Sequence, residues 1–159
     1  MKIIVPDYYR EFSCIAGQCR HSCCTGWEID IDEASLERYD VMPGTYGEIL
    51  RGRIDRTGAV PHYQLGEGER CPFLRPDGLC EMILELGEDA LCQICADHPR
   101  FRNYFTVRVE IGLGLCCEAA GALILKRKEP MKLDLLSDNG VNEPSDGEEQ
   151  ALLSFREML

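Results

Sequence analysis

The chain lacks an apolar run long enough to cross a bilayer. Its longest candidate, Ala119–Leu125, is about a third of the roughly 20 residues that a spanning helix needs. The first residues also lack a signal-peptide core, because Asp7, Arg10 and Glu11 interrupt the apolar residues there. We therefore expect a soluble, cytoplasmic protein that has no membrane partner.

Positive charge is also scarce in this sequence. It has 17 Lys and Arg residues against 28 Asp and Glu residues, and its net charge is -11. Binding of nucleic acid depends on a basic face that neutralises phosphates. The composition therefore excludes nucleic acid as an expected partner.

Cysteine, in contrast, is abundant. A cytoplasmic compartment keeps thiols reduced, so ten cysteines in 159 residues favour a metal site over disulfides. Soft thiolates at short spacings bind zinc, copper(I) or iron-sulfur clusters. The spacings C-x4-C-x3-C-C, C-x8-C and C-x2-C meet that need, and the cysteines form four groups: Cys14, Cys19, Cys23 and Cys24; Cys71 and Cys80; Cys92 and Cys95; Cys116 and Cys117.

Two of these groups contain adjacent cysteines. Neighbouring side chains in an extended backbone point to opposite sides, so Cys23 and Cys24 can face one metal only if the chain turns sharply between them. The same holds for Cys116 and Cys117. With one principal ligand per doublet, the cysteines suffice for one cluster with spare thiols or for two four-thiolate sites.

The predicted fold class is α+β: a small, irregular, cysteine-rich, metal-organised domain with short strands and several helices. Strands are expected at Lys2–Val5 and Phe101–Leu113, the second from its alternation of apolar and polar residues. A turn of sequence RPDG between Cys71 and Cys80 should bring these two thiols together at the base of a hairpin. Helices are expected at 33–39, capped by Asp32, and at 46–54, 81–86, 88–95 and 118–128.

Three segments are expected along the chain. Residues 1–128 are interpreted as the cysteine-rich domain that binds a metal or a cluster. Residues 129–149 are polar and acidic and read as a linker. Residues 150–159 recover helical character and stop without a terminator, so we expect the start of a truncated helical region of a longer parent protein.

The order of the cysteine blocks along the chain is distinctive. They read C-x4-C-x3-C-C-x2-W from Cys14, then CPFL from Cys71, GLC ending at Cys80, LG at Leu86, C-x3-PR from Cys95 and C-x-EAA from Cys116. Over residues 12 to about 125, this order resembles the N-terminal half of flagellin lysine-N-methylases. The first three blocks also resemble zinc- or iron-chelating domains.

The resemblance implies methyl transfer from S-adenosylmethionine to lysines of flagellin. It also implies an iron-sulfur cluster, expected to be of the 4Fe-4S type, and zinc is the alternative. Family members read Cys-Pro where this chain has Cys116-Cys117, and Cys92 has no family counterpart, so Cys92 and Cys117 are interpreted as non-ligands. The cysteines that match the family, and are therefore the predicted metal ligands, are Cys14, Cys19, Cys23, Cys24, Cys71, Cys80, Cys95 and Cys116.

The sequence offers no recognisable site for the methyl donor. Glu110–Gly114 imitates a glycine-rich nucleotide loop but lacks a third glycine and the repeated strand-helix units of such folds. The radical S-adenosylmethionine motif C-x3-C-x2-C is absent, because Cys24 directly follows Cys23. Catalytic residues and the donor site are therefore left unassigned.

Other interpretations remain open at this point. The chain could be a zinc-stabilised protein-binding module without catalytic activity. Its thiols could be buried as small hydrophobes, and Cys92-x2-Cys95 could be a redox pair, although no strand-helix frame precedes it. His21 or His98 could replace a thiolate, but each is more readily interpreted as a surface residue or as one that supports a ligand.

Overall fold

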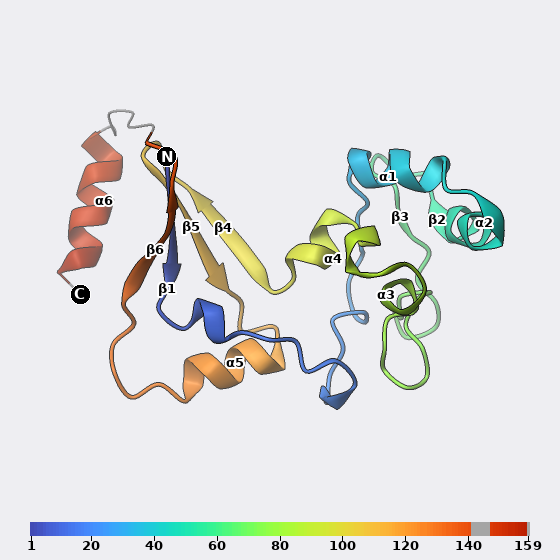
Figure 1. Ribbon diagram of the computed structural model, residues 1–159, viewed down its shortest axis with the longest axis horizontal. Coiled ribbons are helices and arrows are strands. Elements are labelled where there is room, and N and C mark those ends of the chain that lie inside the picture. Colours follow the sequence, from blue (N-terminus) through green and yellow to red (C-terminus); the bar gives the residue numbers. More distant parts are fainter. Residues whose placement is uncertain (141–146, 159) are drawn as a thin grey trace. The chain divides into compact units, whose positions relative to one another are not determined.

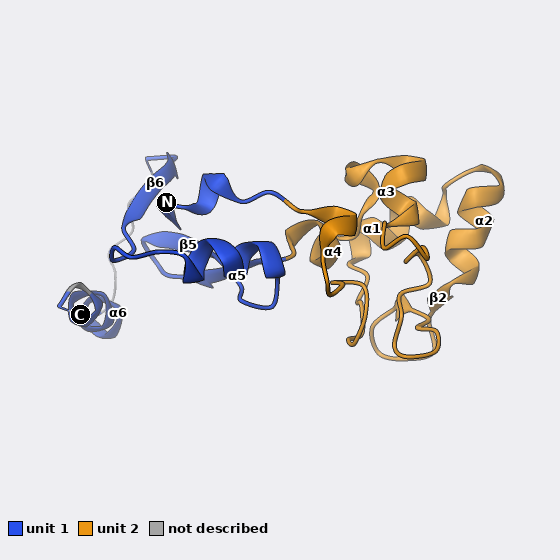
Figure 2. Cartoon of the chain, turned by 90° about the horizontal axis from the view of Figure 1, so that it is seen from below, with its two compact units in different colours: residues 1–13, 99–159 blue, residues 14–98 orange. Residues whose placement is uncertain are grey.

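The computed structural model describes residues 1–140 and 147–158, and these form two compact units (Figure 2). Unit 1 comprises Met1–Ser13 and Pro99–Leu159, and unit 2 comprises Cys14–His98. Helices and short strands occur in the same chain, which confirms the predicted α+β class. The boundaries of the two units, at Cys14 and Pro99, differ from the segments expected from the sequence. No helix of the described residues is both long and apolar enough to span a membrane.

Unit 1 is built on a four-stranded sheet in the order β4-β5-β1-β6 (Figure 1). Strand β1 runs parallel to β5, whereas β6 and β4 pair antiparallel with β1 and β5. Val5, Val109 and Ile111 form a small core on the sheet. The strands are β1 (Lys2–Pro6), β4 (Arg100–Tyr104), β5 (Arg108–Leu113) and β6 (Leu133–Asp138).

The predicted single strand at Phe101–Leu113 is wrong, because this segment is the hairpin β4-β5. The turn closes through a hydrogen bond of 2.9 Å from the Phe105 N–H to the Arg108 carbonyl. Apolar and polar residues alternate from Phe105 through the turn into β5, so the local sequence does not reveal the turn. In the hairpin, Gly112 faces the ring of Phe101, and a Cβ at Gly112 would lie 2.2 Å from that ring.

Strand β6 lies inside the segment that was expected to be an acidic linker. Asp134 and Asp138 mask a strand pattern, and Leu136 packs against the Val5 core. Pairing with β6 satisfies the outer edge of β1, which local composition could not reveal. Residues 141–146 of the expected linker, and residue 159, lie outside the described residues.

Two helices complete unit 1. Helix α5 (Glu118–Leu125) lies at the end of the sheet where β1 and β5 finish, and its Ala120 packs with Tyr8 and Leu113 (Figure 1). Helix α6 (Gly147–Glu157) includes part of the predicted helical segment. Its Arg156 pairs with the buried carboxylate of Glu110 at 2.9 Å. A short 3-10 turn, η1 (Tyr9–Glu11), follows β1.

Unit 2 contains little regular structure for its length. Its buried core is built from side chains of nearly every element, with Tyr39, Leu50, Tyr63 and Phe73 among the most enclosed. The elements are η2 (Ala16–Gln18), α1 (Glu33–Asp40), α2 (Gly44–Gly52), β2 (Ile54–Asp55), β3 (His62–Tyr63), α3 (Glu81–Leu86), η3 (Glu88–Ala90) and α4 (Gln93–Asp97). Loops therefore carry much of this unit, including most of its cysteines.

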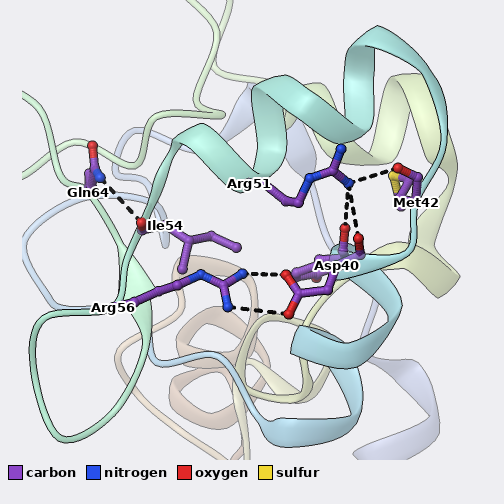
Figure 3. Close-up of polar contacts among 7 residues, drawn as sticks. Asp40, Met42, Arg51, Ile54, Arg56 and Gln64 are labelled. Carbon is purple, nitrogen blue, oxygen red and sulfur yellow. Dashed lines mark hydrogen bonds and ion pairs between the residues drawn. The ribbon is translucent and has the colours of Figure 1, made fainter.

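Helices α1 and α2 form a tight corner (Figure 3). Arg51 of α2 donates to the backbone carbonyls of Tyr39 and Met42 at 3.0 and 2.8 Å, which satisfies the carboxyl end of α1. Gly47 lies against the carbonyl of Met42, so close that a Cβ would come within 2.2 Å of the oxygen. The position therefore requires glycine.

The predicted helix at 88–95 is also wrong, because the chain opens at Leu91 and Cys92 between η3 and α4. Arg38 donates to the carbonyls of Asp89 and Leu91, and the Asp32 carboxylate accepts a 2.7 Å hydrogen bond from the Gln93 N–H. These contacts come from α1, far away in the sequence. Tertiary hydrogen bonds thus override the local helical preference.

Replacing Asp32 by Ala is expected to lower the free energy of unfolding by about 2 kcal/mol. One carboxylate oxygen caps α1 by accepting from the Ser35 N–H at 3.0 Å, and the other accepts from Gln93. Chemical denaturation at neutral pH measures the effect. Glu37→Ala, on the exposed side of the same helix, is the matched control and should change stability by no more than about 0.5 kcal/mol. Equal effects of the two substitutions would contradict the capping role.

The stabilisation that the Asp32 carboxylate provides should depend on pH. Burial raises the pKa of the Asp32 carboxyl, but the hydrogen bonds from Gln93 and Ser35 outweigh burial and leave the pKa below its ordinary value. The ionised Asp32 carboxylate therefore contributes its full stabilisation above its pKa in the unfolded state, about 3.9. This stabilisation is lost as the pH falls through the lower pKa of Asp32 in the folded state. The stability gap between the wild type and Asp32→Ala should narrow below a pH of about 4.

Candidate metal centre

The first two predicted ligands lie at the start of unit 2. Cys14 is exposed, and its sulfur accepts a 3.4 Å hydrogen bond from the Ala16 N–H. Cys19 follows η2 and is half-buried. Ala16 adopts a positive φ of 47°, and the Cα of Gly17 approaches Leu79 so closely that a Cβ would lie 3.4 Å from its side chain. The loop of Cys14 and Cys19 therefore packs beside the turn that precedes Cys80.

The adjacent pair Cys23 and Cys24 occupies a sharp turn. Their sulfurs are 3.9 Å apart, so the backbone does turn far enough for both to face one side. Trp27 holds this turn by donating from its indole Nε1 to the Cys23 carbonyl at 2.8 Å. The Cys24 carbonyl then accepts a 2.8 Å hydrogen bond from the Cys71 N–H, which joins the first cysteine group to the second.

Cys71 and Cys80 flank the RPDG turn. Leu74 and Cys80 form an antiparallel bridge, and the Arg75 N–H donates to the Leu79 carbonyl at 3.0 Å, so this segment is a tight hairpin. Phe73 anchors the hairpin in the core, where its ring meets Tyr63 edge to face at 5.1 Å. Cys71 is buried, and Cys80 is half-buried at the start of α3.

Cys92 and Cys95 complete a group of thiols in one apolar core. Cys92 is fully buried immediately before α4, and Cys95 is half-buried within the helix. We call the five cysteines of this core the thiol cluster: Cys24, Cys71, Cys80, Cys92 and Cys95. Cys92 was interpreted as a non-ligand because it has no family counterpart. Its C-x2-C spacing to Cys95 was the signal that pointed to it.

The thiols of the cluster interact in pairs. The hydrogen bond from Cys24 lowers the pKa of Cys71, and the hydrogen bond from Cys95 lowers the pKa of Cys92. The pKa of a thiol that donates such a hydrogen bond shifts upward: hydrogen bonding to Cys92 raises the pKa of Cys95. The hydrogen bond from Cys23 lowers the pKa of Cys24, but the bond to Cys71 and burial outweigh it and raise that pKa to about 12. A thiophilic metal would displace the protons of the thiols that bind it.

The last predicted ligand, Cys116, belongs to unit 1. It is exposed between β5 and α5, and its sulfur lies back over Gly114, where an added Cβ would be 3.0 Å away. The neighbouring Cys117 is half-buried at the start of α5 and packs with Tyr8 and Leu113. The packing of Cys117 fits its interpretation as a small hydrophobe.

The donor chemistry of unit 2 fits a thiophilic metal, because several soft sulfurs lie together in an apolar core. Among the residues described, however, no three Cys, His, Asp or Glu side chains already converge on a point from which one ion could be bound. Binding would therefore require the thiols to turn from their mutual hydrogen bonds toward a shared centre.

The histidines contribute less than the cysteines. Burial lowers the pKa of His98, and the ring of His98 lies 6.3 Å from that of Trp27. His21 is exposed. Among the described residues, neither histidine belongs to a group of three possible metal ligands.

The fold and the site together define a class of protein: a cysteine-rich α+β protein with clustered thiols. The chain is 29% identical over 137 residues to the "Lysine-N-methylase" of Salmonella typhimurium (strain LT2) and equally to that of Salmonella choleraesuis (strain SC-B67). It is 28% identical over 137 residues to the "Flagellar biosynthetic protein FliU" of Salmonella muenchen. The resemblance predicted from the cysteine blocks is therefore confirmed.

The coverage of these matches differs between relatives. Each match includes 80% of this chain, but only 33% of either lysine-N-methylase and 79% of the FliU protein. The chain thus matches about a third of the length of the lysine-N-methylases. No family profile matches the chain, and no solved structure matches it.

Proposed function

We propose that this chain is the N-terminal, cluster-binding part of a protein-lysine N-methyltransferase that acts on flagellin with S-adenosylmethionine as methyl donor. The observation that carries the proposal is the match to two lysine-N-methylases over 80% of the chain. The flagellar name of the third relative supports a flagellar protein as the substrate.

The proposed cofactor is an iron-sulfur cluster, with 4Fe-4S as the expected type. Its proposed ligands come from the family-matching cysteines: Cys14, Cys19, Cys23, Cys24, Cys71, Cys80, Cys95 and Cys116. Support comes from unit 2, where Cys24, Cys71, Cys80 and Cys95 share one core. When bound, the cluster would supply thiolate-iron bonds that tie the loops of unit 2 together.

A zinc-stabilised binding module is the second candidate. It draws support from Cys23 and Cys24, whose sulfurs are 3.9 Å apart. Tetrahedral zinc with Zn–S bonds of about 2.3 Å places its sulfurs about 3.8 Å from each other. In this alternative the metal replaces part of a hydrophobic core and the unit serves protein recognition without catalysis.

Methyl transfer can be tested with flagellin and labelled S-adenosylmethionine under anaerobic conditions. This chain alone is expected to label nothing. Joined to the remaining two-thirds of the Salmonella typhimurium relative, in place of the segment that it matches, it is expected to label lysine side chains of flagellin. Mass spectrometry of the labelled peptides identifies the modified residues.

Two controls make the outcome decisive. The same fusion with Cys71→Ser and Cys80→Ser should lose activity, because both thiols lie in the shared core. The fusion with Cys117→Ser should keep it, since Cys117 packs in unit 1. A folded, metal-loaded fusion that leaves flagellin unlabelled while the intact relative labels it would overturn the proposed function.

A further inference from the structure

Strand β6 leads directly into an Asn-Gly dipeptide, Asn139-Gly140, that is exposed to water. Gly140 adopts a φ of 75°, a left-handed value that glycine takes without strain. Because Gly140 has no side chain, its backbone nitrogen is open on the side of the neighbouring Asn139 amide. Closure of a five-membered ring between the two residues therefore meets little steric resistance.

The carboxylate of Asp138 contacts the nitrogen that would close this ring. Its Oδ1 accepts a hydrogen bond of 2.9 Å from the Gly140 N–H. An amide nitrogen can form a new bond to a carbonyl carbon only if its proton leaves, and a carboxylate within hydrogen-bond reach of that proton can accept it. Asp138 thus has the position of a general base for attack by Gly140.

The side-chain carbonyl of Asn139 is also held in place. Its Oδ1 accepts a hydrogen bond from the backbone nitrogen of Met1, and the Asn139 N–H donates to the Met1 carbonyl at 3.4 Å. Met1 is positioned by β1, in which Lys2 is the partner of Asp138. Negative charge develops on Oδ1 when its carbon is attacked, and a donor that is already in place stabilises that charge. The pairing of β1 with β6 therefore brings a base and an oxyanion donor to one dipeptide.

We propose that Asn139-Gly140 is a modification site at which the chain deamidates its own asparagine. The Gly140 nitrogen bonds to the side-chain carbonyl carbon of Asn139 while its proton passes to Asp138. The bond from that carbon to the side-chain nitrogen then breaks, and the nitrogen leaves as ammonia with the proton. Water opens the resulting succinimide ring to aspartate or isoaspartate, so the step needs no oxidant, metal or cofactor.

The modification changes the end of the outer strand of unit 1. Both products carry a negative charge next to Asp138, and charges of the same sign repel each other at this separation. Isoaspartate also lengthens the backbone by one methylene before Gly140, which displaces the turn that follows β6. We therefore expect the end of β6 to pair less firmly with β1 after deamidation. This inference is independent of metal binding and of methyl transfer.

Incubation of the full chain at neutral pH tests the inference. Tandem mass spectrometry of its peptides locates each conversion of an amide to a carboxyl group and distinguishes isoaspartate from aspartate. Asn139 is expected to convert about tenfold faster than in a synthetic peptide of residues 134–140 with blocked ends, which lacks β1. Asn103, which pairs with Glu110 and precedes the bulky Tyr104, is the internal control and should stay unchanged. A folded chain that converts Asn139 no faster than the peptide would overturn the inference.

Two variants separate the base from the charge of the strand. Asp138→Ala removes the acceptor of the Gly140 N–H and is expected to slow the conversion of Asn139 about tenfold. Asp134→Ala removes an exposed carboxylate four residues earlier in β6 and should leave the rate unchanged. Hydrogen exchange of the amides that pair β1 with β6 verifies that both variants keep the strand in place. An unchanged or faster rate in Asp138→Ala would show that Asp138 does not act as the base, and would contradict the inference.

Discussion

If unit 2 binds the proposed metal, its removal is expected to unfold unit 2 and to leave the sheet of unit 1 intact. The elements of unit 2 are short, with helices of five to nine residues and strands of two. A structural zinc bound by thiolates contributes an apparent binding free energy of about 10 to 16 kcal/mol. The free energy of unfolding of a whole domain is about 5 to 15 kcal/mol, which is similar or smaller. Loss of these bonds should therefore remove most of the stability of unit 2.

Hydrogen exchange of the full chain follows both units at once. After chelation, the amides of Tyr63 and Cys71, which donate to the carbonyls of Ile29 and Cys24, should lose their protection. The amides that pair β1 with β5 should keep theirs. Chelator already saturated with metal is the control. Continued protection of Tyr63 and Cys71 in a metal-free chain would contradict a structural role of the metal.

Phe73→Ala is expected to lower the free energy of unfolding by about 3 to 5 kcal/mol. The ring is 1% exposed and is enclosed by Tyr63 on one side and by the Arg53 guanidinium, 4.9 Å from its centre, on another. Arg53 is itself fixed by an ion pair of 2.9 Å with Glu81 and by donation to the Pro72 carbonyl. Because Phe73 anchors the hairpin of Cys71 and Cys80, metal affinity should fall as well.

Phe101→Ala in unit 1 is the matched control for this substitution. The Phe101 ring covers Gly112 but is 49% exposed, so its loss should cost about 1 kcal/mol at most. Denaturation of the metal-loaded full chain, followed by tyrosine and tryptophan fluorescence, compares the two variants. A cost of Phe73→Ala no larger than that of Phe101→Ala would show that the hairpin does not depend on this anchor.

Local sequence signals were sufficient to predict the helices whose ends are fixed by nearby residues. Asp32 caps α1 and Gly87 ends α3, and these helices begin and end where capping chemistry predicts. The errors occur where distant residues decide. The β4-β5 turn is hidden by an alternation that continues through it, and β6 exists because β1 offers an edge to pair with.

The candidate site shows the same division. Spacing and resemblance selected Cys24, Cys71, Cys80 and Cys95, and these four share one core in unit 2. Cys92 was interpreted as a non-ligand because it has no family counterpart. Its burial depends on hydrogen bonds that Gln93 and Leu91 make with Asp32 and Arg38, about 50 to 60 residues away in the chain, so the local sequence does not reveal it. Cys14, Cys19, Cys23 and Cys116 remain predicted ligands.

Thiols from distant stretches of unit 2 are proposed to bind a shared metal centre. Anaerobic purification of the full chain, followed by a visible spectrum and by iron, sulfide and zinc analysis, tests this proposal. We predict a coloured protein with iron and acid-labile sulfide in stoichiometric amounts. Zinc without sulfide would support the thiolate site but contradict the cluster. A folded, colourless chain with neither metal, and no change on addition of chelator, would contradict metal binding by unit 2.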